Sequence, residues 1–126
     1  MDDSILKFVQ LAVGQAERSD HNHYRHGAVV FDDKGNIISK GYNSKRVVPK
    51  LKKYGYPNLY HHAESYALMK ARPEHLAGSS IMVVRVSPTK LSNSKPCVHC
   101  MGLLKESGIT TIYYSTAFGL IERIYL

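Results

Sequence analysis

The chain has 126 residues and a formal net charge of +7, and its two cysteines form a single C-x-x-C group. This length can bury one core without disulfide bonds, so we expect one domain over residues 1–126, in a reducing compartment such as the cytoplasm. Acidic residues stand where a secretory signal would carry positive charge, and no apolar run approaches the roughly 20 residues of a membrane span. We therefore expect neither a signal peptide nor a membrane partner.

The first half of the chain predicts a helix and a β-hairpin. Asp3 or Ser4 can cap a helix that runs to about Arg18, because apolar residues recur along one face. The turn-rich segment 32–36 separates two short apolar runs, which indicates a hairpin. The two predicted strands are residues 27–31 and 37–42.

The second half predicts two helices, each followed by a strand. A helix over 62–71 should stop before Pro73, because the residue that precedes a proline avoids helical angles. A helix over 97–107 begins after Pro96 and ends at Gly108. The strands that follow them are residues 81–86 and 109–115.

The order of these elements predicts an α/β fold, a three-layer sandwich of a five-stranded mixed sheet with helices on both faces. Strands joined through helices should run parallel, with right-handed crossovers. The tail differs, because a turn at 116–119 leads into a last strand over 120–126 with no room for a crossover helix. We therefore expect the fifth strand to be antiparallel to its neighbour.

Two short motifs carry the chemistry of the chain: His62-Ala63-Glu64 and, farther along, Pro96-Cys97-Val98-His99-Cys100. His62, Cys97 and Cys100 offer one imidazole and two thiolates, which are preferred zinc ligands. Three protein ligands leave the fourth tetrahedral position open, as a catalytic zinc requires. His62 is a better candidate than His61, because only His62 places Glu64 at a two-residue offset. We expect one Zn²⁺ per chain.

Glu64 stands where it can reach a zinc-bound water without being a ligand. Zinc lowers the pKa of such a water from about 15.7 to about 7. Glu64 can take the water's proton and deliver protons to a ring nitrogen and a departing amine, first as general base and then as general acid. H-x-E followed by P-C-x-x-C is the signature of zinc nucleobase deaminases, which predicts release of ammonia from cytosine or adenine.

Other uses of these residues explain less. A C-x-x-C pair also occurs in redox proteins and structural zinc sites, but the chain has no second C-x-x-C and no histidine after Cys100. A thioredoxin-like interpretation would leave His62 and Glu64 unexplained. The alternative to an enzyme is a relative that keeps zinc for stability without catalysis.

A basic segment leads into the zinc motif. Between Asp33 and Glu64 the chain has seven lysines and arginines, interleaved with tyrosines, and no acidic residue. This composition suits contact with a phosphate or a nucleic acid, and tyrosines can stack on bases. Lys45 and Arg46 are the candidate phosphate contacts. A solvated surface loop is the alternative.

Histidines outside the zinc motif carry a weaker signal. His21, His23 and His26 precede the first predicted strand and are interpreted as loop residues, with a second metal site or a substrate contact as the alternatives. His99 is expected to face outward or to support its loop. His61 either contacts substrate or packs against the protein.

The motifs and the strand order resemble the cytidine deaminase-like superfamily over nearly the whole chain, most of all the cytidine and deoxycytidylate deaminase zinc-binding domain family. Residues 25–30 (RHGAVV) look like the family's first strand. There the Gly27-Ala28 pair would let the backbone approach the bound base. Asn43, at the end of the second strand, looks like the asparagine that touches the sugar hydroxyl.

The same resemblance implies further contacts. The backbone N–H of Ala63 would meet the base carbonyl, and the backbone carbonyl of Lys95 would face the leaving amine. Residues 112–115 are similar to the fourth strand of deoxycytidylate deaminases, which places Tyr114 near the substrate. Because the family usually builds its pocket partly from a neighbouring subunit, we expect a homo-oligomer.

Three departures from the free-nucleoside enzymes favour a nucleotide. Those enzymes usually have Cys at the position of His62, Glu at that of Lys45 and Arg at that of Met101, and Lys45 with Arg46 suggests an anionic substrate. We expect a zinc-dependent cytosine nucleotide or nucleoside deaminase, with a dCMP- or CMP-like substrate favoured. The alternatives are a polynucleotide cytidine or adenosine deaminase acting on single-stranded DNA, RNA or tRNA, and a non-catalytic zinc- or RNA-binding relative.

Overall fold

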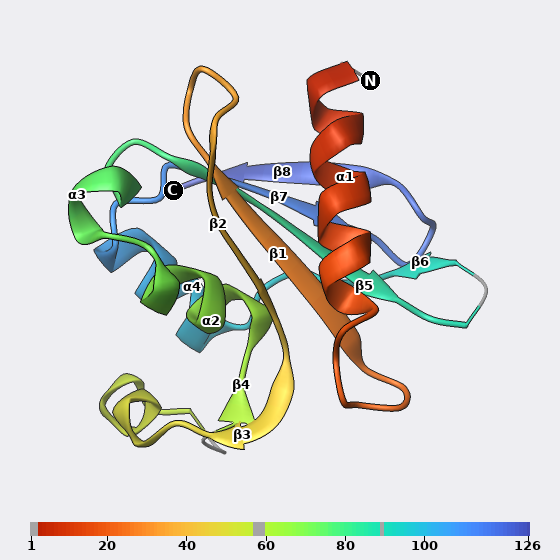
Figure 1. Cartoon of the computed structure of the whole chain (residues 1–126), viewed down its shortest axis with the longest axis horizontal. Helices are drawn as coiled ribbons and strands as arrows, with labels where there is room; N and C mark the ends of the chain where they lie inside the picture. Colours follow the sequence, from red (N-terminus) through yellow and green to blue (C-terminus); the bar gives the residue numbers. More distant parts are fainter. Residues whose placement is uncertain (1–2, 57–59, 89) are drawn as a thin grey trace.

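The computed structural model describes residues 3–56, 60–88 and 90–126 of the chain. Its centre is a mixed sheet whose main strands follow the order β2-β1-β5-β7-β8 (Figure 1). These strands are β1 (Arg25–Phe31), β2 (Ile37–Tyr42), β5 (Ser80–Val86), β7 (Thr111–Ser115) and β8 (Ile121–Tyr125). The short strand β6 (Leu91–Ser92) pairs with the end of β5. The predicted mixed sheet of five main strands is confirmed.

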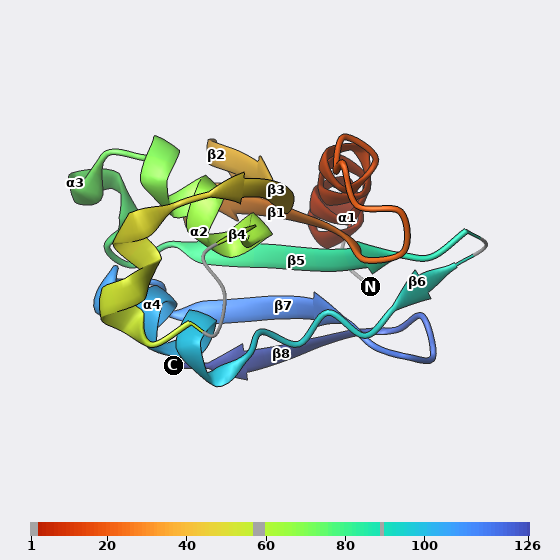
Figure 2. The same cartoon turned by 90° about the horizontal axis from the view of Figure 1, so that it is seen from below.

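The strand directions follow from the lengths of the connections. β1 is antiparallel to both β2 and β5, whereas β5 and β7 are parallel and are joined through α4 (Val98–Glu106). β8 is antiparallel to β7, and its arrow points opposite to those of β5 and β7 in Figure 2. Residues 116–120 alone connect β7 to β8, which is too short for a crossover. The prediction of an antiparallel last strand is confirmed.

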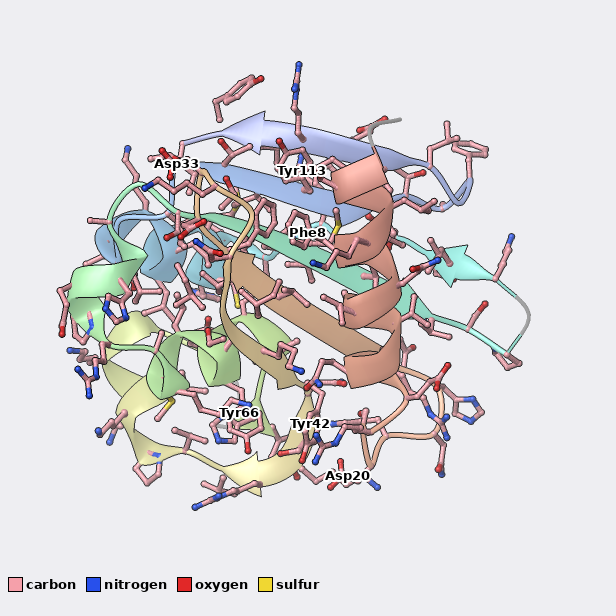
Figure 3. The ribbon with its side chains drawn as sticks, turned by 45° about the horizontal axis from the view of Figure 1, so that its top comes forward. Phe8, Asp20, Asp33, Tyr42, Tyr66 and Tyr113 are labelled. Atoms are coloured by element: carbon pink, nitrogen blue, oxygen red, sulfur yellow. The ribbon has the colours of Figure 1, made fainter. Side chains whose placement is uncertain are left out.

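Helices cover both faces of the sheet. α1 (Asp3–Ala16) lies across β1 and β5, and Phe8 stacks on Phe31 with ring centroids 3.8 Å apart. Figure 3 shows Phe8 near Tyr113 on this side. α2 (Ala63–Lys70), α3 (Pro73–Leu76) and α4 contribute to the core on the other face. Along β1, Val29 faces α1 whereas Ala28 faces α2, as the alternation of a strand requires.

Two glycines let the helices approach the sheet closely. A Cβ on Gly41 would lie 2.5 Å from the Ala67 nitrogen in α2. A Cβ on Gly27 would lie 1.9 Å from the Ala12 carbonyl oxygen in α1. Gly41 therefore brings α2, with the His62 motif at its start, against β2. Gly27 makes room for α1. The approach of the Gly27-Ala28 backbone to a bound base stays a prediction.

Several short elements were not predicted from the sequence, because their residues show no helical or strand periodicity. The basic segment contains β3 (Ser44–Val47) and the 3₁₀ helix η1 (Pro49–Tyr54), and β3 pairs with β4 (Tyr60–His61). Elements of two to six residues hold too few side chains to show a helical or strand period. α1 also ends at Ala16, short of the predicted Arg18. Within the described ranges, the helices are too short or too polar to cross a membrane.

Candidate zinc site and catalytic pocket

His62, Cys97 and Cys100 come together although the sequence separates them. Their ligand atoms all lie within 4.8 Å of one another, and His62 Nδ1 is 3.5 Å from Cys100 Sγ. His62 is the N-cap of α2, Cys97 is the N-cap of α4, and Cys100 lies in the first turn of α4. Ser65 holds the start of α2, because its hydroxyl accepts from the His62 N–H at 3.1 Å. The start of each helix therefore delivers its ligands to one point.

The two cysteines differ in their protonation. Cys97 accepts hydrogen bonds from the Cys100 thiol and from the backbone N–H groups of Cys100 and His99. These hydrogen bonds lower the pKa of Cys97 to about 5. The same thiol–thiolate hydrogen bond, together with burial, raises the pKa of Cys100. One sulfur is thus already a thiolate near neutral pH, and Cys100 gives up its proton when a metal binds.

The donor set fits zinc. Burial lowers the pKa of His62, which favours the neutral imidazole that a metal requires. One imidazole nitrogen and two sulfurs are ligands that zinc accepts in tetrahedral geometry. Three donors at this spacing leave one coordination position for a substrate-derived or solvent oxygen, which is the pattern of a catalytic site.

Glu64 lies beside this donor set on the first turn of α2. Its side chain is 6 % exposed. Glu64 lines one cavity of about 300 Å³ together with two of the three donors, His62 and Cys97. Burial raises the pKa of Glu64 to about 7. A carboxyl group with a pKa near neutrality can both accept and release a proton at the pH of a cell, as general acid–base catalysis requires.

Polar groups from four segments enclose the cavity. The lining residues are His21, Tyr24, His26, Asn43, Tyr60, His61, His62, Ala63, Glu64, Ser94, Lys95, Pro96 and Cys97. Its volume is at the lower end of the range for small-ligand sites. The three predicted substrate contacts Asn43, Ala63 and Lys95 are therefore brought together with the metal ligands and Glu64.

Asn43 also has a structural role. Its Oδ1 accepts a hydrogen bond from the His26 N–H at 2.8 Å, and its Nδ2 donates to the Tyr24 carbonyl. Its backbone N–H donates to the His26 carbonyl at 3.2 Å. Asn43 thus ties the end of β2 to the start of β1 at the edge of the cavity. The predicted contact with the sugar hydroxyl would use the same Asn43 side-chain amide that makes these hydrogen bonds.

Four other predicted substrate contacts lie outside the residues that line the cavity. Ala28 is fully buried against α2, and the Tyr114 hydroxyl donates to Glu122 at 2.9 Å. The Lys45 N–H donates to Asp20 at 3.0 Å. Arg46 lines a separate cavity of about 300 Å³ together with His61 and Tyr66. Figure 3 shows Tyr66 near Tyr42 at that side of the molecule.

Three histidines that the sequence left open line the catalytic cavity. His21, His26 and His61 all contribute to it, and His61 is buried with its ring tilted against Tyr66. Burial, aided by the positive charge of Arg85, lowers the pKa of His26 to about 4, so this imidazole is neutral at physiological pH. His26 lies within β1 and His61 within β4, so the interpretation of His26 as a loop residue is wrong. Position in the sequence alone did not show which way these side chains point.

The fold and this pocket define a class of zinc-binding deaminase domain. Residues 2–116 match the family described as the cytidine and deoxycytidylate deaminase zinc-binding region, and the chain belongs to that family. The chain has no significant match among curated proteins.

Solved structures share the fold at low sequence identity. A cytidine deaminase from Burkholderia pseudomallei is similar with a TM-score of 0.68 and 18 % identity, covering 95 % of this chain and 91 % of that one. A dCMP deaminase from the cyanophage S-TIM5 has a TM-score of 0.64 and 23 % identity, and the match covers 92 % of this chain and 86 % of that one. A RibD protein from Acinetobacter baumannii has a TM-score of 0.59 and 18 % identity, and the match covers 90 % of this chain but only 28 % of that one. The family match makes zinc the cofactor, and these likenesses extend across enzymes with different substrates.

Proposed function

We propose that the protein is a hydrolytic deaminase that converts the cytosine of a nucleotide or nucleoside to uracil and releases ammonia, with a dCMP- or CMP-like substrate favoured. The observation that carries the proposal is the position of Glu64. This buried acid lines the same cavity as His62 and Cys97, and its pKa is raised to about 7. A site that only bound zinc or RNA would have no use for a proton carrier at that place.

His62, Cys97 and Cys100 would hold the zinc. When bound there, zinc lowers the pKa of a coordinated water to about 7 and so supplies a nucleophile. Glu64 would accept one proton from the attacking water and pass it to the ring nitrogen. It would then take the remaining proton from the new hydroxyl on the ring carbon and deliver it to the departing amine. Water and the amino-bearing carbon form the new C–O bond, the C–N bond breaks, and the products are a keto base and ammonia.

Other lining residues would orient the base. The Ala63 N–H lies at the start of α2, where backbone N–H groups have no partner within the helix. It can therefore donate to the base carbonyl. Lys95 directly precedes Pro96 and lines the same cavity, so its carbonyl can accept from the departing amine. Together these two contacts would favour a pyrimidine that carries both a carbonyl and an amino group, such as cytosine, over bases that lack one of them.

The cations near the cavity bear on substrate choice. Lys95 is exposed and lines the cavity, whereas Lys45 and Arg46 are exposed on β3 outside it. Of these three cations, Lys95 is therefore the best placed to contact a single phosphate on the substrate. The basic side chains of β3 and η1 support the second candidate function, a polynucleotide deaminase, because they could contact a strand that extends beyond the pocket.

A product assay tests the proposal. Zinc-loaded protein is incubated with dCMP, CMP, cytidine, deoxycytidine, dCTP and single-stranded oligonucleotides, and the uracil forms are separated by chromatography. We expect turnover of dCMP or CMP, and a loss of roughly 10²- to 10⁴-fold in the Glu64→Gln variant, which keeps the shape of the side chain but carries no proton. Conversion of oligonucleotides alone would favour the second candidate, and no conversion by zinc-loaded protein would refute an enzyme.

A further inference from the structure

Tyr56 reaches the zinc site from a segment that contains none of the zinc motifs. It follows η1 and Gly55, whose φ of 79° is the left-handed conformation that glycine adopts readily. η1 lies beside α4 (Figures 1 and 2). Tyr56 is 6 % exposed, and with Val48 and Leu51 it forms a small buried cluster against Cys100. The segment therefore covers the buried sulfur of the site.

One side chain touches two of the three proposed ligands. The Tyr56 hydroxyl oxygen lies 2.7 Å from Cys100 Sγ. Its ring meets the His62 imidazole edge to face, with centroids 4.6 Å apart and planes at 68°. The His99 ring also lies near it, at 5.4 Å between centroids. These contacts come from both polar and apolar parts of the tyrosine, so they are separable by substitution.

The direction of the hydrogen bond follows from the chemistry of the ligand. A thiolate bound to a metal has no proton, so the hydroxyl must be the donor. Donation draws negative charge from the sulfur, which makes the sulfur a weaker electron donor and also harder to protonate. Groups that hydrogen-bond to metal ligands fix their orientation and affect metal affinity. The ring in turn restricts rotation of the His62 imidazole.

We propose that Tyr56 is a positioning residue of the zinc site, in which its hydroxyl donates to the Cys100 thiolate and its ring holds the plane of His62. The inference rests on the proposed zinc function. It assigns to the basic segment a role beyond contact with phosphate, because the turn after η1 is what places this tyrosine on the metal ligands.

The test compares Tyr56→Phe with wild-type protein in two measurements that do not depend on turnover. Zinc affinity is measured by competition with a chelator, and Co²⁺ is substituted so that the sulfur-to-metal charge-transfer absorption can be recorded. Loss of the hydroxyl should weaken zinc binding roughly 10- to 100-fold, because the sulfur is then more easily protonated and is held less firmly in position. It should also move the charge-transfer band to longer wavelength, because a sulfur without its hydrogen bond gives up an electron more easily.

Tyr113→Phe is the matched control. Tyr113 lies on the α1 side of the sheet, so removal of its hydroxyl should change neither zinc affinity nor the Co²⁺ spectrum. Tyr56→Leu removes the ring as well and should weaken metal binding further than Tyr56→Phe. If Tyr56→Leu does not fold, Tyr56→Phe, which keeps the ring contacts, still decides the question.

The outcomes separate this inference from the proposed function. If wild-type protein shows thiolate–Co²⁺ absorption and Tyr56→Phe matches it in spectrum and zinc affinity, Tyr56 only fills the core and the inference is wrong. If wild-type protein shows no thiolate–Co²⁺ absorption, the zinc site itself is wrong and the proposed function falls with it.

Discussion

The hydroxyl oxygens of Ser94 and Ser115 lie 2.9 Å apart and hold the cysteine motif against the sheet. Ser94 Oγ donates to the Val83 carbonyl at 2.7 Å and accepts from the Ser115 N–H at 2.8 Å. Ser115 Oγ donates to the Ser92 carbonyl at 2.6 Å. Both serines are buried. Because Ser94 directly precedes the loop that carries Lys95 and Cys97, these bonds fix that loop relative to β5 and β7.

Ser94→Ala should destabilise the protein and impair catalysis together. It leaves the Val83 carbonyl and the Ser115 N–H without this buried partner, which costs about 1–3 kcal/mol of unfolding free energy. We expect kcat to fall as the loop loses its position, with both effects measured by denaturant unfolding and steady-state kinetics. Ser87→Ala is the control, because its hydrogen bond to the Lys90 carbonyl is exposed and its loss should change stability by less than about 0.5 kcal/mol. Unchanged stability in Ser94→Ala would contradict the role of the pair.

Acid should destabilise the fold through His26. Its pKa is about 4 in the folded protein and 6.5 for an unperturbed histidine, so the unfolded chain binds the proton more tightly. The stability that a neutral His26 preserves is complete above pH 6.5 and is lost as the pH falls toward 4. Between pH 7 and pH 5 this contribution is about 2 kcal/mol. Chemical denaturation of His26→Gln at both pH values should show a pH dependence smaller by that amount, and an identical dependence would refute the assignment.

Removal of zinc should lower the thermal stability of the whole protein. The three donors tie the start of α2 to the start of α4, so metal binding favours the folded state. We expect one zinc per chain by elemental analysis, and a lower Tm after treatment with a chelator that readdition of zinc reverses. Cys97→Ser should lower zinc content, whereas the exposed Val98→Ser next to it should not. A Tm that does not respond to zinc would show that the site does not contribute to stability.

Lys95 should distinguish nucleotides from nucleosides. Because Lys95 lines the cavity, Lys95→Ala should raise KM about tenfold or more for dCMP and much less for deoxycytidine, as expected for one charged hydrogen bond. Lys45→Ala and Arg46→Ala are the matched controls outside the cavity and should change the ratio little. A larger effect at Lys45 or Arg46 would restore these two as the phosphate contacts. Equal, salt-dependent effects at several lysines would favour a polynucleotide substrate.

We expect a homo-oligomer, and the apolar face of α1 is not available to form its interface. The apolar face of α1 is used within the chain, where Phe8 is 2 % and Val9 8 % exposed. A cavity of about 990 Å³ between η1, α2, α3 and α4 is lined by Leu68, Leu76 and the half-exposed Met69. We expect light scattering to show an oligomer that Met69→Lys weakens.

The control for this prediction lies on α1. Leu6 is as exposed as Met69 but is remote from that cavity, so Leu6→Lys should leave the oligomer intact. A wild-type monomer at micromolar concentration would contradict the expectation, and it would add weight to an open, polynucleotide-binding site. Equal effects of Leu6→Lys and Met69→Lys would place the interface elsewhere.

The sequence by itself determined the zinc-ligand motifs and the direction of the last strand. The spacing of His62 and Glu64 fixes one ligand and the acid on a single helical turn, and C-x-x-C does the same for the two sulfurs. The short connection before β8 allowed no crossover, so the direction of that strand followed from chain length. These relationships are local, since they depend on a few neighbouring residues and on backbone geometry.

Only the tertiary structure decided which distant side chains share the site. Tyr56 reaches Cys100, and His26 enters the cavity, because η1 and β1 pack beside helices that are far away in the sequence. The same packing leaves Lys45 and Arg46 outside the cavity, although they stand near Asn43 in the chain. A strand or a turn can aim successive residues to opposite sides, so proximity in sequence says little about the side of the molecule on which a charge lies.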